Sequence, residues 1–475
     1  MVVETKEVKI IHFKTYGCSH NVADSETMAQ HLLMSANSEQ NSVSNLVSNS
    51  EFAFGLVSNS EFTSSSSSSK YSFKITGLSP ETSSEKFIEE ADLIIYNTCT
   101  VKNPSDDKFF SLLKKMTGKK PLIIAGCISQ AQKNSEWIKE YSAIGVDQLD
   151  KIVEVVQGTL NGEVVHRLEK LLGPYERNFI PLQRKNAHIA VIPILSGCLG
   201  NCSYCKTKSA RGVLRSVKLD SVITQIRLAK SAGIKEIWLV SEDNGAYGLD
   251  IGLTFPDLLR EISLIEGDFK VRIGMLNAEY AYRYRNELAE LMTKDCFFKF
   301  LHIPIQAANN SVLKSMVRLY TIEEFETAVN VIREKNPTLN LATDIICGFP
   351  TETKIQWDDT MNFLKRFPFD IINISKFYPR PGTPAAKMQL IPTDEVKRRS
   401  KELTEWFNSV NLNSPLVGSE LQVFFDDKGV EKGTLIGRSD NYKQVIVNAE
   451  EKLLGTFQKV KIVDCVRDYL YGELV

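Results

Sequence analysis

The sequence predicts an α/β protein built from several domains. A chain of 475 residues is too long for one hydrophobic core, and its length indicates roughly two to four domains. Short apolar strands alternate with helical segments over most of the chain, which is typical of parallel sheets. From about residue 412 the pattern changes to alternating apolar and polar residues, which favours a small β-barrel at the C-terminal end.

The N-terminal domain is expected at residues 8–165. Apolar segments at 10–13, 91–98 and 121–126 predict three strands, and the helical patterns between them favour a parallel, flavodoxin-like sheet. Ligands of such sheets collect beyond the carboxyl ends of the strands. Helices are expected to begin at Asp24 and to span residues 106–116.

Three cysteines follow these strands. Cys18, Cys99 and Cys127 each lie just beyond the end of one predicted strand, so the sheet should bring them to one edge. Single buried cysteines usually have only a packing role. The repeated placement after a strand favours another interpretation, in which the three thiolates together hold an iron–sulfur cluster.

Residues 35–70 interrupt this domain. They are rich in Ser and Asn, contain an unbroken serine run at 64–69, and repeat the sequence LVSNSEF at 46–52 and 56–62. Such a segment is too polar and repetitive to build a core, so we expect a disordered low-complexity insertion at the surface.

The central domain is expected at residues 180–410, where strands and helices alternate as in a partial (β/α)6 barrel. The chemistry of such barrels lies at the C-terminal ends of the strands. Polar residues occupy several of these ends: Ser241, Glu242, Asp243, Asn277, Gln306 and Asp344. Strands are expected at 189–194, 236–240, 270–276, 300–305, 340–346 and 371–378, and helices at 221–232, 255–265, 287–294, 311–317, 322–335 and 357–367.

The first strand of this domain leads into Cys198, Cys202 and Cys205, with the spacing C-x3-C-x2-C. Three thiolates can hold three irons of a [4Fe-4S] cluster and leave the fourth iron open to an external ligand. A zinc site would need a fourth protein ligand, and the closest histidine is His188. A disulfide is disfavoured by the odd total of nine cysteines and by the compartment expected below. Cys296, Cys347 and Cys465 have no partner at ligand spacing and are expected to be structural.

Composition is ordinary for a soluble protein, with 43% hydrophobic residues, 24% charged residues and a net charge of −1. The N-terminus lacks the apolar region of a signal peptide, and no apolar run is long enough to cross a membrane. We therefore expect a cytoplasmic protein without a membrane segment. Any nucleic-acid binding must come from local basic patches.

The cysteine spacing followed by strand–helix repeats resembles the radical S-adenosylmethionine (SAM) enzymes, whose open iron chelates SAM. Together with the N-terminal cysteines, it resembles the methylthiotransferases within that superfamily, over nearly all of the chain outside the insertion. The motifs that carry this resemblance are FKTYGCSHNVADS at 13–25, YNTCTV at 96–101 and AGC at 125–127.

Longer motifs resemble one branch, the archaeal and eukaryotic threonylcarbamoyladenosine tRNA methylthiotransferases. They are CKTKSARG at 205–212, SEDNGAYG at 241–248, ATDIICGFP at 342–350 and FYPRPGTPAAKM at 377–388. The resemblance implies methylthiolation of C2 of N6-threonylcarbamoyladenosine next to the anticodon. It also implies two [4Fe-4S] clusters, two equivalents of SAM, a tRNA substrate, a flavodoxin- or ferredoxin-like electron donor and a sulfur donor. We expect a monomer.

Two positions depart from the family pattern. Ala307, after Gln306, replaces a residue with a hydroxyl, which puts any hydrogen bond of that hydroxyl in doubt. Thr351 stands where the family usually has Gly, and we expect it to affect only a turn. The residues expected to bind SAM are Ser241, Glu242, Asp243, Gln306, Asp344 and Arg211.

The C-terminal domain, residues 412–475, resembles the TRAM module, an OB-like RNA-binding barrel, through GRSDNY at 437–442. From residue 414 onward acids outnumber bases by ten to eight, so RNA contacts would be local. A stronger basic signal is the acid-free run from Lys206 to Leu219, which could meet RNA phosphates. The residues expected to contact RNA are Lys206, Lys208, Arg215, Arg380, Arg438 and Lys443.

Other functions stay open at this point. A methylthiotransferase could instead act on isopentenyladenosine in tRNA or on a ribosomal-protein aspartate, as sister branches do. A noncatalytic iron–sulfur protein that binds RNA is the alternative from another class, and an assay for 5′-deoxyadenosine would separate it from the enzymes.

Overall fold

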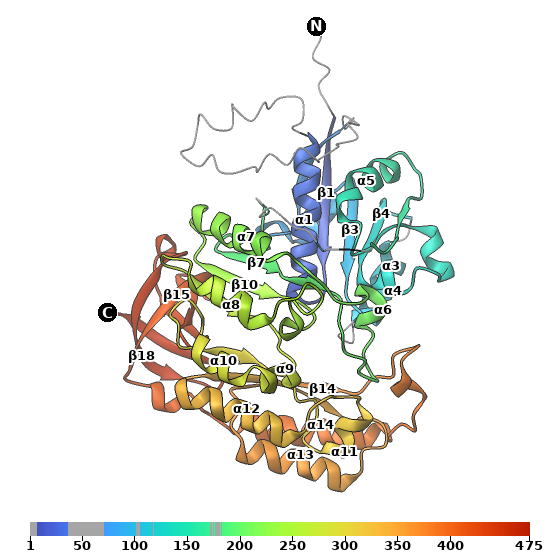
Figure 1. The fold of residues 1–475 in the computed structure, drawn as a ribbon. Coiled ribbons are helices and arrows are strands. Elements are labelled where there is room, and N and C mark those ends of the chain that lie inside the picture. Colours follow the sequence, from blue (N-terminus) through green and yellow to red (C-terminus); the bar gives the residue numbers. More distant parts are fainter. Residues whose placement is uncertain are drawn as a thin grey trace. The chain divides into compact units, whose positions relative to one another are not determined.

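The computed structural model describes residues 7–36, 71–100, 105–116, 118–171, 173, 175, 181 and 183–475. Most of the predicted 35–70 insertion lies outside these residues. The chain forms two compact units (Figure 1): the first contains Met1–Gly197, Lys206–Arg215 and Asp220–Gly233, and the second contains the rest. No helix among the described residues is both long and apolar enough to span a membrane.

The first unit contains a six-stranded parallel sheet, with β1, β3 and β4 next to one another in Figure 1. Its order, β2-β1-β3-β4-β5-β6, is the flavodoxin-like order extended by one strand. The predicted sheet is thus confirmed, while β2, β5 and β6 were not predicted. The strands are β1 Glu7–Thr15, β2 Tyr71–Thr76, β3 Leu93–Thr98, β4 Leu122–Gly126, β5 Ser142–Ile144 and β6 His166–Arg167.

Both faces of this sheet are buried, as expected for parallel strands. In β3, Leu93 and Ile95 join one apolar core, whereas Ile94 and Tyr96 join the core on the opposite face. The prediction that the first helix begins at Asp24 is wrong, because α1 begins at Ser19, directly after the turn that carries Cys18. The helices of this sheet domain are α1 Ser19–Ala36, α2 Glu85–Glu90, α3 Ser105–Met116, α4 Cys127–Ala131 and α5 Ile152–Leu160.

The central strands are parallel where they pair. Strand β10 pairs with β11, β12 pairs with β13, β13 pairs with β14, and a bridge from Met275 to His302 continues the run from β11 to β12. This is the arrangement expected of a partial (β/α)6 barrel. The strands are β7 Ile189–Pro193, β8 Leu195–Ser196, β9 Arg215–Ser216, β10 Glu236–Val240, β11 Lys270–Ile273, β12 Phe300–His302, β13 Asn340–Cys347 and β14 Ile371–Lys376.

The central helices alternate with these strands. Helix α13 begins at Lys354, earlier than predicted, because Thr353 and Gln356 form a capping box. Residues 287–294, predicted as one helix, overlap the second of two short helices, and α14 was not predicted. The helices are α6 Thr207–Arg211, α7 Leu219–Ser231, α8 Phe255–Ser263, α9 Ala278–Arg283, α10 Arg285–Leu291, α11 Asn310–Ser315, α12 Ile322–Lys335, α13 Lys354–Arg366 and α14 Thr393–Asn408.

The C-terminal residues form the predicted small barrel, which is closed in the order β15-β16-β17-β19-β18. Its interior is filled by the inward-facing apolar residues of every strand, including Val423, Leu435, Val445, Val460 and Leu470. The last strand was not predicted. The strands are β15 Glu420–Lys428, β16 Thr434–Ser439, β17 Gln444–Asn448, β18 Phe457–Cys465 and β19 Tyr469–Leu474.

The turn between β16 and β17 docks the barrel on the central sheet within the second unit. Tyr442 is buried against Phe298 and Phe300, and its hydroxyl contacts Glu236 Oε1 at 3.1 Å. Glu236 begins β10 and Phe300 begins β12. The barrel is therefore attached at the N-terminal ends of the central strands.

Candidate cluster sites

Three cysteines meet at the carboxyl edge of the N-terminal sheet. Cys99 and Cys127 directly follow β3 and β4, and Cys18 follows β1 after a short turn. The Cys99 side chain hydrogen-bonds with both Cys18 and Cys127. Cys99 and Cys127 are buried, whereas Cys18 is exposed, so the group of thiols can be reached from the surface.

Glycines with positive φ precede two of these cysteines. Gly17 has a φ of +125°, and a Cβ at this position would lie 2.4 Å from Cys99 Cβ. Gly126 has a φ of +87°, and a Cβ there would lie 2.2 Å from Asn97 Oδ1. Only glycine provides both the backbone conformation and the space that bring the thiols together.

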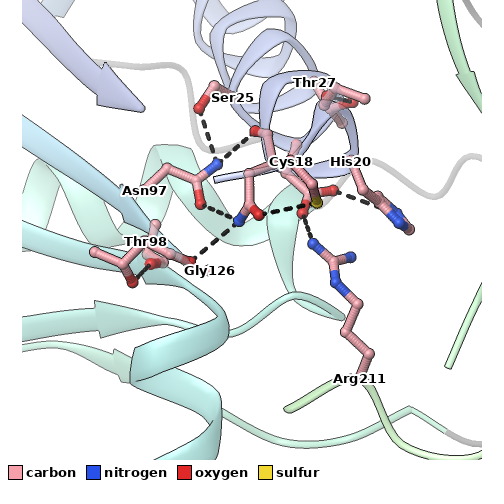
Figure 2. A network of polar contacts seen from close by, with 12 residues as sticks. Cys18, His20, Ser25, Thr27, Asn97, Thr98, Gly126 and Arg211 are labelled. Atoms are coloured by element: carbon pink, nitrogen blue, oxygen red, sulfur yellow. Dashed lines mark hydrogen bonds and ion pairs between the residues drawn. The ribbon is translucent and has the colours of Figure 1, made fainter. Parts of the chain in front are cut away.

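A network of buried amides holds the turns that carry Cys18 and Cys99 (Figure 2). Asn21 Nδ2 donates to Asn97 Oδ1 and to the Thr98 carbonyl, both at 3.1 Å. Asn97 Nδ2 donates to the Asn21 carbonyl at 2.7 Å and to Ser25 Oγ at 2.9 Å. The Cys18 thiol contacts Asn21 Oδ1 at 3.4 Å. The start of α1 and the end of β3 are therefore joined side chain to backbone in both directions.

A buried ion pair lies beside the same thiols. Arg211 Nη2 is 2.6 Å from Asp24 Oδ2, and the two side chains are only 2% and 0% exposed. Figure 2 shows the Arg211 side chain reaching toward the start of α1. Arg211 was expected to bind SAM. That role stays a prediction, and the structure places its guanidinium in the N-terminal unit, among the thiols of the first cysteine set.

The thiols share their protons unequally. The hydrogen bond from Cys99, aided by the charge of Arg211, lowers the pKa of Cys18 to about 5. The same hydrogen-bond partner lowers the pKa of Cys127, and the pKa of Cys99 is raised because it donates to both neighbours. Thiolates are the form of cysteine that binds metal, so the donor set suits an iron–sulfur cluster.

The second cysteine set occupies one loop, Cys198–Cys205. Gly197, with a φ of +87°, precedes it, and the Gly200 amide donates to Cys198 Sγ at 3.2 Å. The three thiols are half-buried. Burial, together with the charge of Asp243, raises the pKa of Cys198 to about 12. A loop of three half-buried thiols suits a cluster that must remain accessible on one side.

The carboxyl end of α11 supports this loop. The Ser203 amide donates to the Met316 carbonyl at 3.0 Å, and Ser203 Oγ donates to the Ser315 carbonyl at 2.9 Å. Helix-end carbonyls have no partner within their own helix, so the loop satisfies them.

Arg318, which sequence reasoning missed, lies directly under Cys202. Its Nη1 is 3.5 Å from Cys202 Sγ, and its Nη2 donates to Asn277 Oδ1 at 2.8 Å and to the Pro304 carbonyl at 3.0 Å. No local signal could have identified this residue, because its partners come from three other segments of the chain.

The strand-end residues predicted to bind SAM form hydrogen bonds within the loops around this site. Asp243 is buried, accepts hydrogen bonds from the Gly245 and Asn277 amides at 3.1 and 3.0 Å, and burial raises its pKa to about 7. Ser241 Oγ accepts from the Asp243 amide at 3.1 Å. Glu242 is half-buried in the same turn.

The two remaining strand-end residues are joined through the backbone. Gln306 has a φ of +65°, unusual for a residue with a side chain, and its amide donates to the Asp344 carbonyl at 2.8 Å. Asp344 Oδ1 accepts from Asn373 at 2.7 Å and lies 3.0 Å from His302 Nε2. SAM binding by these residues stays a prediction. Ala307 is buried, so a hydroxyl there would also be buried.

The structure does not support three of the predicted RNA contacts. Arg215 is buried and paired with Asp147. Lys443 is 2.9 Å from Asp370, with only 11% of its side chain exposed, and Arg438 pairs with Asp426 and lies over the Tyr442 ring. Arg438 lies near the end of β16, and Lys443 lies in the turn that docks the barrel. Lys206, Lys208 and Arg380 are partly exposed, and their contact with RNA stays a prediction.

None of the nine cysteines, all of which lie in the described part of the chain, forms a disulfide. Among the described residues no three Cys, His, Asp or Glu side chains are placed to ligate a single metal ion. In a [4Fe-4S] cluster each thiolate binds a different iron, which is a different requirement.

The comparisons with known proteins agree with this geometry. The chain matches the Radical SAM superfamily at residues 192–364, the Uncharacterized protein family UPF0004 at 70–145 and the TRAM domain at 416–475. Fold and cysteine loop together thus define the class: a radical SAM enzyme with a TRAM domain.

Curated relatives specify the family. The threonylcarbamoyladenosine tRNA methylthiotransferases of Drosophila melanogaster and Homo sapiens are 36% and 35% identical to this chain, over 98% of it and over 77% and 74% of their own lengths. A probable threonylcarbamoyladenosine tRNA methylthiotransferase of Archaeoglobus fulgidus is 37% identical over 82% of this chain and 91% of its own length. The chain belongs to the threonylcarbamoyladenosine tRNA methylthiotransferase family.

A solved structure supports the fold alone. The radical SAM methyltransferase TsrM from Kitasatospora setae, solved with tryptophan and a SAM analogue, has a TM-score of 0.52 at 14% identity, over 86% of this chain and 77% of its own length.

Proposed function

We propose that this protein is a tRNA-modifying transferase that places a methylthio group on C2 of N6-threonylcarbamoyladenosine next to the anticodon. The observation that carries the proposal is the pair of three-thiol sites in a chain that belongs to this family. Replacement of a C–H on an adenine ring needs a hydrogen-abstracting radical, because general acid–base catalysis cannot remove this unactivated hydrogen. When bound, the iron–sulfur and SAM cofactors supply that radical.

In this proposal Cys198, Cys202 and Cys205 hold the cluster that receives SAM. The loop is partly covered by the end of α11, and Asp243 and Asn277 are hydrogen-bonded to each other beside it. These contacts fix the loop. The donor set, three thiolates without a fourth protein ligand, leaves one iron for SAM.

The proposal assigns a second [4Fe-4S] cluster to Cys18, Cys99 and Cys127, with the task of delivering sulfur that a second SAM methylates. Support comes from their convergence at one edge and from the low pKa of Cys18 and Cys127. Arg211, Asp24 and the amides of Asn21 and Asn97 would keep the thiols in place.

The remaining parts of the proposal concern organisation. It divides the chain into an N-terminal domain at 8–165, a radical SAM domain at 180–410 and a TRAM domain at 412–475. In this proposal the protein is a cytoplasmic monomer. It receives electrons from a flavodoxin- or ferredoxin-like donor and sulfur from a separate donor. A reducing compartment keeps the six ligand thiols free of disulfides.

The test uses the reconstituted full chain under anaerobic conditions, with SAM, dithionite and sulfide. One tRNA carries threonylcarbamoyladenosine and a matched tRNA carries isopentenyladenosine. Mass spectrometry of the digested nucleosides should show a methylthio product only from the first tRNA, together with 5′-deoxyadenosine. Product from the second tRNA alone would assign the sister substrate. SAM cleavage without product from either tRNA would point to a protein substrate, and the absence of 5′-deoxyadenosine would leave only a binding function.

A further inference from the structure

The second cysteine loop is supported by a segment that no motif in the sequence identifies, residues 310–320. Two contacts from Ser203 reach the carbonyls at the end of α11, and Arg318 reaches Cys202. Ser315, Met316 and Arg318, which make these contacts, all lie within a few residues of the end of α11. The segment therefore holds the backbone and one sulfur of the loop at the same time.

The backbone at this helix end is strained. The Val317 amide donates to the Lys314 carbonyl at 3.0 Å, and the Arg318 amide donates to the Leu313 carbonyl at 2.9 Å. This is the pattern that ends many helices, with a left-handed residue at the position of Val317, where glycine is usual. Val317 has a φ of +57°, and a β-branched residue in this conformation is a genuine outlier. Strain of this kind concentrates at sites where a geometry is needed for function.

The strained turn directs Arg318 back toward the cysteine loop. The guanidinium is fixed by Asn277 and the Pro304 carbonyl and lies 5.2 Å from the centre of the Tyr320 ring. Its Nε is buried and has no hydrogen-bond partner among the residues that the structure describes. A buried, ordered cation with a spare donor beside Cys202 suits an anionic group that the three cysteines would hold.

We propose that Arg318 positions Cys202 and raises the reduction potential of the cluster that Cys198, Cys202 and Cys205 hold. This inference rests on the proposed function, because it needs a cluster on these cysteines. Hydrogen bonds to the sulfurs and the net charge around a cluster set its potential. Reduction adds one electron, so a nearby positive charge favours the reduced state.

The test isolates this cluster by combining Cys18→Ala, Cys99→Ala and Cys127→Ala in the full chain. In this parent, Arg318 is changed to Lys, Gln or Met. The readouts are iron content and the midpoint potential from a titration followed by electron paramagnetic resonance. Arg366→Met serves as the matched control, because Arg366 is exposed and pairs with Glu326 on the outside of the same unit.

Arg318→Met and Arg318→Gln should each lower the equilibrium constant for one-electron reduction by at least about tenfold, which corresponds to ~59 mV. Arg318→Lys should keep the potential close to that of the parent, and Arg366→Met should not change it. If Met and Gln lose iron while Lys keeps it, and all four variants melt with the parent, the positioning role is supported in the same way.

Two results would overturn the inference. One is an unchanged potential in all variants with full iron content. The other is Lys behaving like Met, which would show that the charge has no part. A parent that holds no [4Fe-4S] cluster would instead contradict the proposed function, so the two failures are distinguishable.

Discussion

The two sets of three cysteines differ in how their residues are spaced along the chain. One set comes from three strand ends separated by as many as 109 residues, counted from Cys18 to Cys127, and the other lies within eight consecutive residues. Both begin after a glycine with positive φ: Gly17 and Gly126 in the first set and Gly197 in the second. A glycine in the left-handed region directly before a cysteine is thus common to both sets.

The residues that hold the two sets of cysteines in place differ. The scattered set is held by side chains that are completely buried, namely Asn21, Asn97, Asp24 and Arg211, so its geometry depends on the folding of the whole sheet. The single loop already has its cysteines together in sequence and is adjusted by one helix end and one arginine. A site assembled from distant segments should therefore respond to buried polar mutations with global unfolding, and a local loop should respond with altered chemistry.

The largest expected effect separates the two sets by their chemistry. Cys202→Ala should abolish 5′-deoxyadenosine formation, because in the proposed function Cys202 is a ligand of the cluster that receives SAM. Cys99→Ala should abolish methylthiolation while some SAM cleavage remains. Chromatography of 5′-deoxyadenosine and mass spectrometry of tRNA nucleosides measure both. Normal methylthiolation by Cys99→Ala would show that the first set has no role in sulfur transfer.

The next effect concerns the buried ion pair beside the scattered set. Arg211→Met removes the arginine that pairs with the buried Asp24 and should reduce the free energy of unfolding by about 3–5 kcal/mol. Urea unfolding of the apoprotein measures this loss. The double variant Arg211→Met with Asp24→Asn should recover part of it, and a single variant as stable as the parent would contradict the dependence on buried pairs.

The amide network should give a smaller loss. Asn97→Leu removes two donated bonds and one accepted bond and leaves Ser25 and the Asn21 carbonyl without this donor. We expect a loss of about 1–3 kcal/mol. The potential of the cluster on Cys198, Cys202 and Cys205 should stay unchanged, since the network belongs to the other set. A shift of that potential would show that the two cysteine sets do not have independent supports.

The smallest effect has the opposite sign. Val317→Gly relieves the left-handed strain of a β-branched residue and should stabilise the fold by about 1 kcal/mol in urea unfolding. Thr351→Gly, which restores the family residue at a φ of +68°, is the matched control for strain outside the cysteine loop. Only Val317→Gly should loosen Arg318 and lower the potential, and a lowered potential in both variants would contradict a local role.

Sequence patterns predicted the parts that depend on local periodicity. The strand before each of Cys18, Cys99 and Cys127 is short and apolar, so the convergence followed from topology. The partner of Arg211 could not be predicted in this way, because Asp24 is 187 residues away and was expected to cap a helix. Pairings over such a distance leave no mark in either local sequence.

The barrel shows a different cause of error. Arg438, Tyr442 and Lys443 combine charge with an aromatic ring, which is what an RNA-binding surface also requires. In the structure they meet Asp426, Glu236 and Asp370 instead. A basic and aromatic cluster has the same composition whether it faces solvent or another domain, so only its surroundings distinguish the two uses. Thr351, too, was expected to affect only a turn, and its positive φ agrees with a turn whose backbone suits glycine.

The barrel and the cysteine loop lie at opposite ends of the central strands. The barrel joins the central strands where they begin, at Glu236 and Phe300. The cysteine loop contacts Arg318, which in turn donates to Asn277 beyond the other end of β11. A strand of five residues, the length of β10, measures about 17 Å. The point where the barrel is attached and the cysteine loop are therefore separated by at least the length of a central strand.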